Sequence, residues 1–132
     1  MTILLTFILG LIALLHLAWA LRIWFPIREE AALARAVVGA KGIAQMPNTA
    51  ACLFVVLALA VVVAALWLQH FALARLLLLG ATLVFLVRGA VAYTPIWRRI
   101  TPEEPFRSND ARFYAPLCLL IGVMLLLVLF GG

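Results

Sequence analysis

Residues 48–93 read NTAACLFVVLALAVVVAALWLQHFALARLLLLGATLVFLVRGAVAY, and most of these residues are apolar. One apolar run covers residues 48–68 and a second covers residues 73–93, with Gln69 and His70 between them. A helix of about 20 apolar residues crosses a hydrocarbon layer about 30 Å thick. Each run is therefore long enough to span a bilayer, and so short a turn makes the two spans antiparallel neighbours. The stretch predicts a membrane-spanning helical hairpin.

Two further apolar runs flank this hairpin, at residues 3–25 and 113–130. The chain has 132 residues, of which 68% are hydrophobic and 11% are charged, whereas soluble domains are about half apolar and a quarter charged. A water-soluble fold is excluded. We expect residues 1–132 to form one all-α domain, an antiparallel bundle of four transmembrane helices.

The basic residues lie mainly in the two longer loops, at residues 26–47 and 94–112, and at the end of the first apolar run. Eight of the ten are Arg22, Arg28, Arg35, Lys41, Arg98, Arg99, Arg107 and Arg112. By the positive-inside rule we expect both loops in the cytoplasm and both termini outside. We expect these cations to contact the anionic headgroups of the lipid bilayer, which is their predicted partner. The net charge of +5 does not indicate nucleic acid binding, because no basic domain with stacking aromatics accompanies it.

The first of these loops carries helix signals between Arg28 and Gly42. Glu29 and Glu30 suit the positive end of a helix dipole, and glycine follows the predicted C-terminus. We expect a short helix lying at the membrane interface, with a plain solvated loop as the alternative.

Arg88 lies more than one turn inside the third span, where a charge costs about 2.5–3.5 kcal/mol on insertion scales. One hypothesis is that its side chain extends to the headgroups. The other is that it pairs with Asp110, or with Glu103 or Glu104, and forms a polar floor at the cytoplasmic end.

His16 is a second candidate in the same leaflet, and Trp19 follows it on the same helix face. A histidine in a bundle more often forms an interhelical hydrogen bond than it serves as a ligand or proton relay. Cys52 and Cys118 are scattered relative to His16 and lack metal-ligand spacing, so we expect no metal and no cofactor.

Four segments resemble a family of small bacterial four-helix membrane proteins of unknown function. They are LHLAWAL (15–21), RAVVGAKGIAQMPNTAACLFVVLAL (35–59), FLVRGAVAY (85–93) and FRSNDARFYAPLCLLIG (106–122). The resemblance implies a multi-pass protein of the bacterial cytoplasmic membrane and supplies no activity. Where serine is expected before Pro116 this chain has Ala115, which puts a capping or ligand-binding role there in doubt.

The resemblance supports one group of positions as the candidate polar cluster. Its members are His16, Trp19, Arg88, Asp110 and Tyr114. All five are expected toward the cytoplasmic side of the bundle.

Three classes of function remain open. The first is a non-catalytic accessory or oligomeric module, alone as a homo-oligomer or within a larger membrane complex. The second is a binder or carrier of a small hydrophobic or lipid-like molecule. The third, ranked last, is a membrane enzyme using His16. The commonest motifs for hydrolysis and nucleotide binding are missing, and no acidic residue lies within a span.

Overall fold

The computed structural model describes residues 1–131 and contains four long helices. They are α1 (Thr2–Ala20), α3 (Thr49–Trp67), α4 (Ala72–Val91) and α7 (Ala115–Phe130). Within residues 1–131, four segments are long and apolar enough to cross a membrane, and the last of them runs from Phe106 to Phe130. The predicted class, an all-helical membrane protein with four transmembrane helices, is confirmed.

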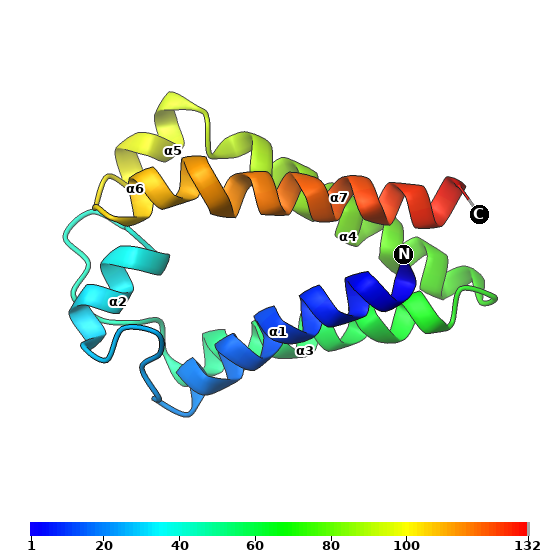
Figure 1. Cartoon of the computed structure of the whole chain (residues 1–132), viewed down its shortest axis with the longest axis horizontal. Helices are drawn as coiled ribbons and strands as arrows, with labels where there is room; N and C mark the ends of the chain where they lie inside the picture. The colour runs from blue at the N-terminus through cyan, green and yellow to red at the C-terminus, as the bar shows by residue number, and fades with distance from the viewer. Residues whose placement is uncertain (132) are drawn as a thin grey trace.

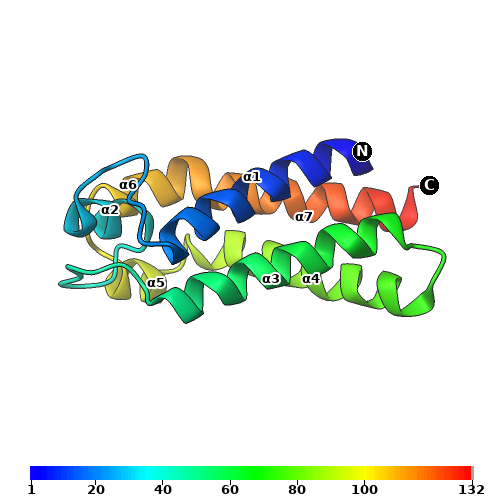
Figure 2. The ribbon, with the colours of Figure 1, turned by 90° about the horizontal axis from the view of Figure 1, so that it is seen from below.

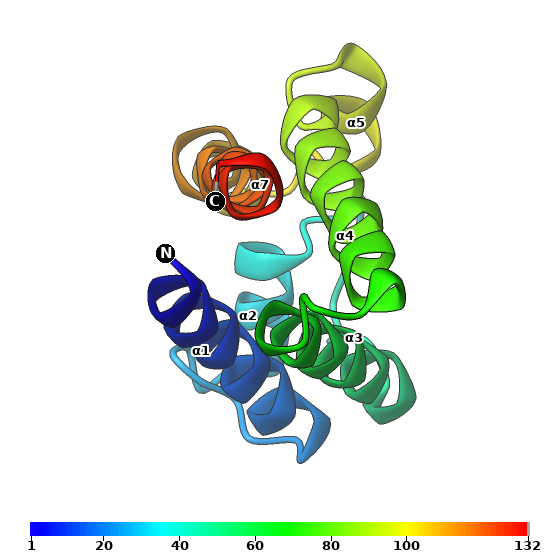
Figure 3. The ribbon, with the colours of Figure 1, turned by 90° about the vertical axis from the view of Figure 1, so that its right-hand side faces the viewer.

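The long helices pack as two pairs, α1 with α3 and α4 with α7 (Figure 1). Both termini lie at the end of the molecule that carries the short turn between α3 and α4, here named the terminal end (Figure 2). From there the pairs diverge toward the opposite end, the loop end, which carries the shorter helices (Figure 1). An end-on view shows α1 and α3 below α7 and α4 (Figure 3).

The core that joins the two pairs lies in the half nearer the terminal end. Its buried residues come from all four long helices: Leu5, Leu9, Leu59, Ala65, Leu66, Ala74, Leu78, Ile121, Met124, Leu125 and Leu129. At this end Arg75 donates to the carbonyl of Leu129 at 2.5 Å, which satisfies a backbone acceptor near the C-terminus of α7. The α3–α4 hairpin is thereby bonded to the last helix.

Close packing within the α4–α7 pair depends on two glycines. A Cβ atom at Gly89 would lie 2.5 Å from the Leu119 side chain, and one at Gly122 would lie 2.5 Å from that of Leu86. Small residues let helix backbones approach closely in lipid, where apolar burial between helices provides little driving force. Close van der Waals packing at these two glycines therefore holds the two helices together.

α1 ends at Ala20, five residues before the end of the predicted span. Arg22 adopts a left-handed conformation (φ 62°), and the Trp19 indole donates to the carbonyl of Phe25 at 2.8 Å. The apolar residues Ile23 to Phe25 continue the hydropathy of the span but lie in an irregular segment after the turn at Leu21 and Arg22. Hydropathy alone therefore overextended this helix.

The loop end contains four short helical elements. They are α2 (Glu30–Val37), α5 (Pro95–Ile100), α6 (Phe106–Asn109) and the π-helical turn η1 (Asp110–Tyr114). The helix expected between Arg28 and Gly42 is present as α2, and the solvated-loop alternative is wrong for residues 30–37. The prediction placed no helix in residues 94–112, where α5, α6 and most of η1 lie.

Pro116 explains the π-helical turn before α7. Proline has no backbone N–H, and its ring collides with the carbonyl four residues earlier in an α-helix. A wider turn avoids this, and the amide of Ala115 bonds to the carbonyl of Asp110 five residues back. The fourth membrane segment therefore continues backward through η1 and α6 instead of starting at Phe113.

Candidate functional site

A polar cluster of three side chains joins α4, α5 and η1 at the loop end. Arg88 donates from Nη2 to Oδ1 of Asp110 at 2.8 Å, and the Trp97 indole donates to Oδ2 of the same carboxylate at 2.8 Å. The Arg88 guanidinium carbon also lies 4.7 Å from the centre of a Trp97 ring, within cation–π range. We name Arg88, Trp97 and Asp110 the loop-end clamp.

The clamp neutralises the buried charges in this part of the chain. The Asp110 side chain is only 4% exposed and that of Arg88 is 30% exposed, and each carboxylate oxygen of Asp110 has a donor. Among the described residues, Nη1 of Arg88 is buried and has no hydrogen-bond partner. A carboxylate engaged on both oxygens is poorly placed for proton transfer, so the arrangement holds segments together rather than presenting a free acid.

Trp97 is the member of this cluster that the sequence did not predict as part of a site. Its position follows from the start of α5, where the Thr94 hydroxyl accepts from the amide of Trp97 at 3.3 Å and Pro95 occupies the first turn. Thr-Pro is a recognisable helix start. That signal could have predicted the helix, but not which side chain its third position would contact.

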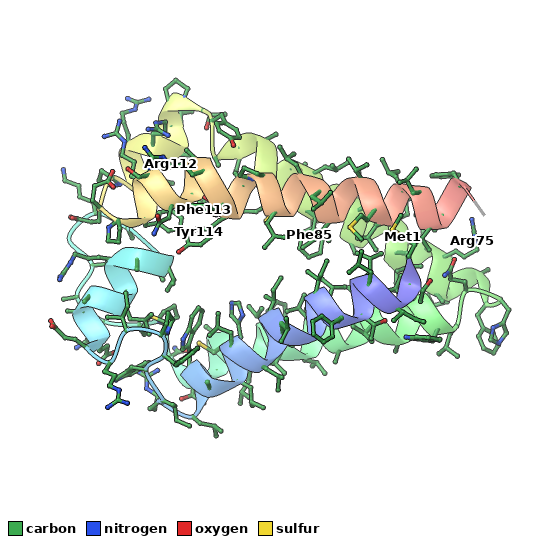
Figure 4. All side chains as sticks on the ribbon, viewed as in Figure 1. Met1, Arg75, Phe85, Arg112, Phe113 and Tyr114 are labelled. Carbon is green, nitrogen blue, oxygen red and sulfur yellow. The ribbon has the colours of Figure 1, made fainter. Side chains whose placement is uncertain are left out.

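Tyr114 lies elsewhere, where α2 meets α6 and η1. Its hydroxyl donates to the carbonyl of Ala36 in α2 at 2.9 Å, and its ring lies 5.7 Å from that of Phe106. The Phe106 ring covers Gly39, just after α2, so closely that a Cβ atom there would overlap it. Tyr114 and Phe85 both point from the α4–α7 pair toward the α1–α3 pair (Figure 4). Tyr114 thus links η1 to α2 at the end of the molecule where the two helix pairs diverge.

His16 and Trp19 belong to the other helix pair. His16 Nδ1 lies 2.8 Å from the carbonyl of Ile12, and a carbonyl only accepts, so Nδ1 carries the proton. Its ring packs edge-on against Trp19 with centroids 4.9 Å apart. Over residues 1–131, no hydrogen bond or ion pair joins either residue to Arg88, Asp110 or Tyr114. Sequence reasoning grouped five residues, and the structure places them in three separate contacts.

The two cysteines lie apart from a common site. Cys52 is buried with Trp19 and Leu33 where α1, α2 and α3 meet, and Cys118 is half-buried in α7. No group of three or more histidine, cysteine, aspartate or glutamate side chains is placed to hold a metal ion within the described part of the chain. Both thiols are therefore interpreted as packing residues.

Comparison with known proteins identifies one family. Residues 9–125 match the model of the family described as "Protein of unknown function (DUF3995)". No curated protein and no solved structure gave a significant match. The family match covers all four membrane segments at least in part, as the resemblance in the sequence implied.

Proposed function

We propose that this chain, which belongs to the DUF3995 family of unknown function, is a non-catalytic module of the bacterial cytoplasmic membrane that acts by assembling with copies of itself. The observation that carries this proposal is the engagement of the candidate polar groups. The side chains of Arg88 and Asp110 bond to each other. The other three candidate side chains bond to backbone carbonyls: Tyr114 to that of Ala36, His16 to that of Ile12, and Trp19 to that of Phe25. These bonds stabilise the fold, and they leave the candidate residues little capacity for catalysis.

One exposed helix face supports assembly. Ala60 and Ala64 lie one turn apart on α3, and both are exposed in the single chain. Neither side chain is buried by the other helices of the bundle. In membranes such small-xxx-small faces allow two helices to approach closely. We infer that this face packs against the same face of a second copy.

The test is the oligomeric state of the full chain in gentle detergent, measured by native mass spectrometry. Wild type is expected as an oligomer, and A60L/A64L as a monomer with an unchanged unfolding midpoint, because these side chains point away from the chain's own core. A58L is the matched control, since Ala58 is exposed on a different face of α3. A monomeric wild type, or equal loss of assembly in A58L, contradicts the proposal.

A second candidate function, binding of a small hydrophobic or lipid-like molecule, is favoured by a different observation. The second buried cluster, at the loop end, joins α1, α2 and α3 through Trp19, Leu33 and Cys52 and contains no residue of α4 or α7. The divergent pairs thus share no buried apolar cluster there among residues 1–131 (Figure 1). Native mass spectrometry that shows one small molecule bound per monomer, still present after delipidation, would support this function.

A further inference from the structure

A groove at the loop end is lined by cations from three separate segments. It has a volume of about 600 Å³, and Lys41 after α2, Arg98 and Arg99 of α5, and Arg107 of α6 all line it. Tyr93, two residues after α4, also lines the groove. These four cations lie up to 66 residues apart in sequence, so the fold gathers them.

Backbone bonds hold the walls of this groove in place. The amide of Lys41 donates to the carbonyl of Ile100 at 3.2 Å, and the amide of Glu103 donates to the carbonyl of Gly39 at 3.1 Å. The Glu103 carboxylate accepts from the amide of Gly42 at 2.9 Å, which engages one of its oxygens. The segment after α2 is thereby fastened to the segment after α5.

Among residues 1–131, the four groove cations have no ion-pair partner. The two ion pairs found over residues 1–131 use Arg22 with Glu30 and Arg88 with Asp110. Like charges held in one groove repel one another, and an anion placed among them removes that repulsion. The groove therefore suits a ligand that carries more than one negative charge.

The surroundings of the groove favour a lipid over a soluble anion. Ile96 and Ile100 lie one turn apart on α5 and are 65% and 54% exposed, and Tyr93 is 49% exposed. Apolar side chains beside arginines are typical of helices that lie in the headgroup region. An acyl chain can cover the isoleucines while the phosphates meet the cations. Basic pockets at such positions bind multiply charged headgroups.

We propose that the groove formed by Lys41, Arg98, Arg99 and Arg107 is a binding site for the headgroup of an anionic phospholipid carrying two phosphates. Arg107 contacts the headgroup from one wall, and the α5 arginines from the other. This inference goes beyond the proposed function and does not depend on oligomerisation.

The test is titration of the full-length chain in zwitterionic detergent with cardiolipin, followed by native mass spectrometry. Each surface cation contributes about fivefold to affinity for anionic lipid. R99Q/R107Q is therefore expected to bind cardiolipin about 25-fold more weakly than wild type. The matched control R28Q/R35Q removes two charges from the same end of the chain but outside the groove, and its affinity should change less than twofold.

Three outcomes would overturn the inference. Equal losses in the two double variants would show general attraction between charges and no site. Equal retention of phosphatidylcholine would remove the role of anionic charge. Displacement of cardiolipin by inorganic phosphate at an equal concentration would identify a phosphate site instead of a lipid site. The same spectra report the oligomer, so loss of lipid binding with an intact oligomer rejects only this inference.

Discussion

Tyr93 donates its hydroxyl hydrogen to the backbone carbonyl of Ala111 at 2.8 Å. Ala111 lies five residues before Pro116, which is the spacing of a π-helical backbone bond. Proline has no N–H to give, so the Ala111 carbonyl lacks its backbone donor. The Tyr93 hydroxyl takes that place and ties the end of α4 to η1.

This relationship predicts a coupling between residues 93 and 116. In the wild-type background, Y93F should lower the free energy of unfolding by about 1 kcal/mol, the usual net value of one hydrogen bond. In a P116A background the new amide of residue 116 can donate to the Ala111 carbonyl. Y93F should therefore lower the free energy of unfolding clearly less than it does in wild type. Denaturant unfolding of the four proteins in micelles measures the difference. Equal costs in both backgrounds would show that the proline and the hydroxyl are independent.

A pair of glycines provides a matched test of how α2 is held. Gly39 and Gly42 both have positive φ, 68° and 73°. A Cβ atom at Gly39 would overlap the Phe106 ring, whereas one at Gly42 would meet nothing within 4 Å. G42A should therefore cost about 1 kcal/mol of stability from backbone strain alone.

At Gly39 the same replacement adds overpacking, typically about 1–3 kcal/mol, to that strain. G39A should thus lower the unfolding midpoint more than G42A, and it should also raise protease cleavage within residues 38–47. Similar unfolding midpoints for the two variants would mean that the Phe106 ring moves aside to accommodate the Cβ atom and does not hold α2 in place.

Membrane orientation is predicted from the charges at the loop end. Four of its cations come from residues 22–41 and four from residues 98–112, while Arg75 lies at the terminal end. The positive-inside rule then places the loop end in the cytoplasm and both termini outside. A C-terminal alkaline phosphatase fusion should be active, and a green fluorescent protein fusion at the same place should be dark. The reverse pattern would invert the topology.

The number of spans and their approximate positions could be predicted from the sequence because their length and apolarity match a bilayer. The Arg88–Asp110 pair could be proposed as one alternative because an isolated charge in a span is costly. The pairing of helices was not predictable. α1, α3 and α7 are apolar on nearly every side, so their sequences prefer no face.

The contacts at the loop end were unpredictable for another reason. Whether Trp97 reaches Asp110, or Tyr114 reaches Ala36, depends on how α2, α5 and η1 settle against one another. Those placements arise from backbone bonds between loops, such as that of Glu103 with Gly39, which have no sequence period. His16 was grouped with Arg88 by membrane depth and by the family resemblance, and neither distinguishes two diverging helix pairs.

We expect the loop-end clamp to stabilise the fold and not to perform chemistry, and unfolding of the Arg88–Asp110 variants measures that stabilisation. Removing one partner of a largely buried pair strands the other charge, so R88L and D110L should each lose about 3 kcal/mol. The double variant R88L/D110L removes both charges and should recover most of that stability, with assembly retained. Single variants as stable as wild type, or a double variant whose losses simply add, would show that the pair does not stabilise the fold.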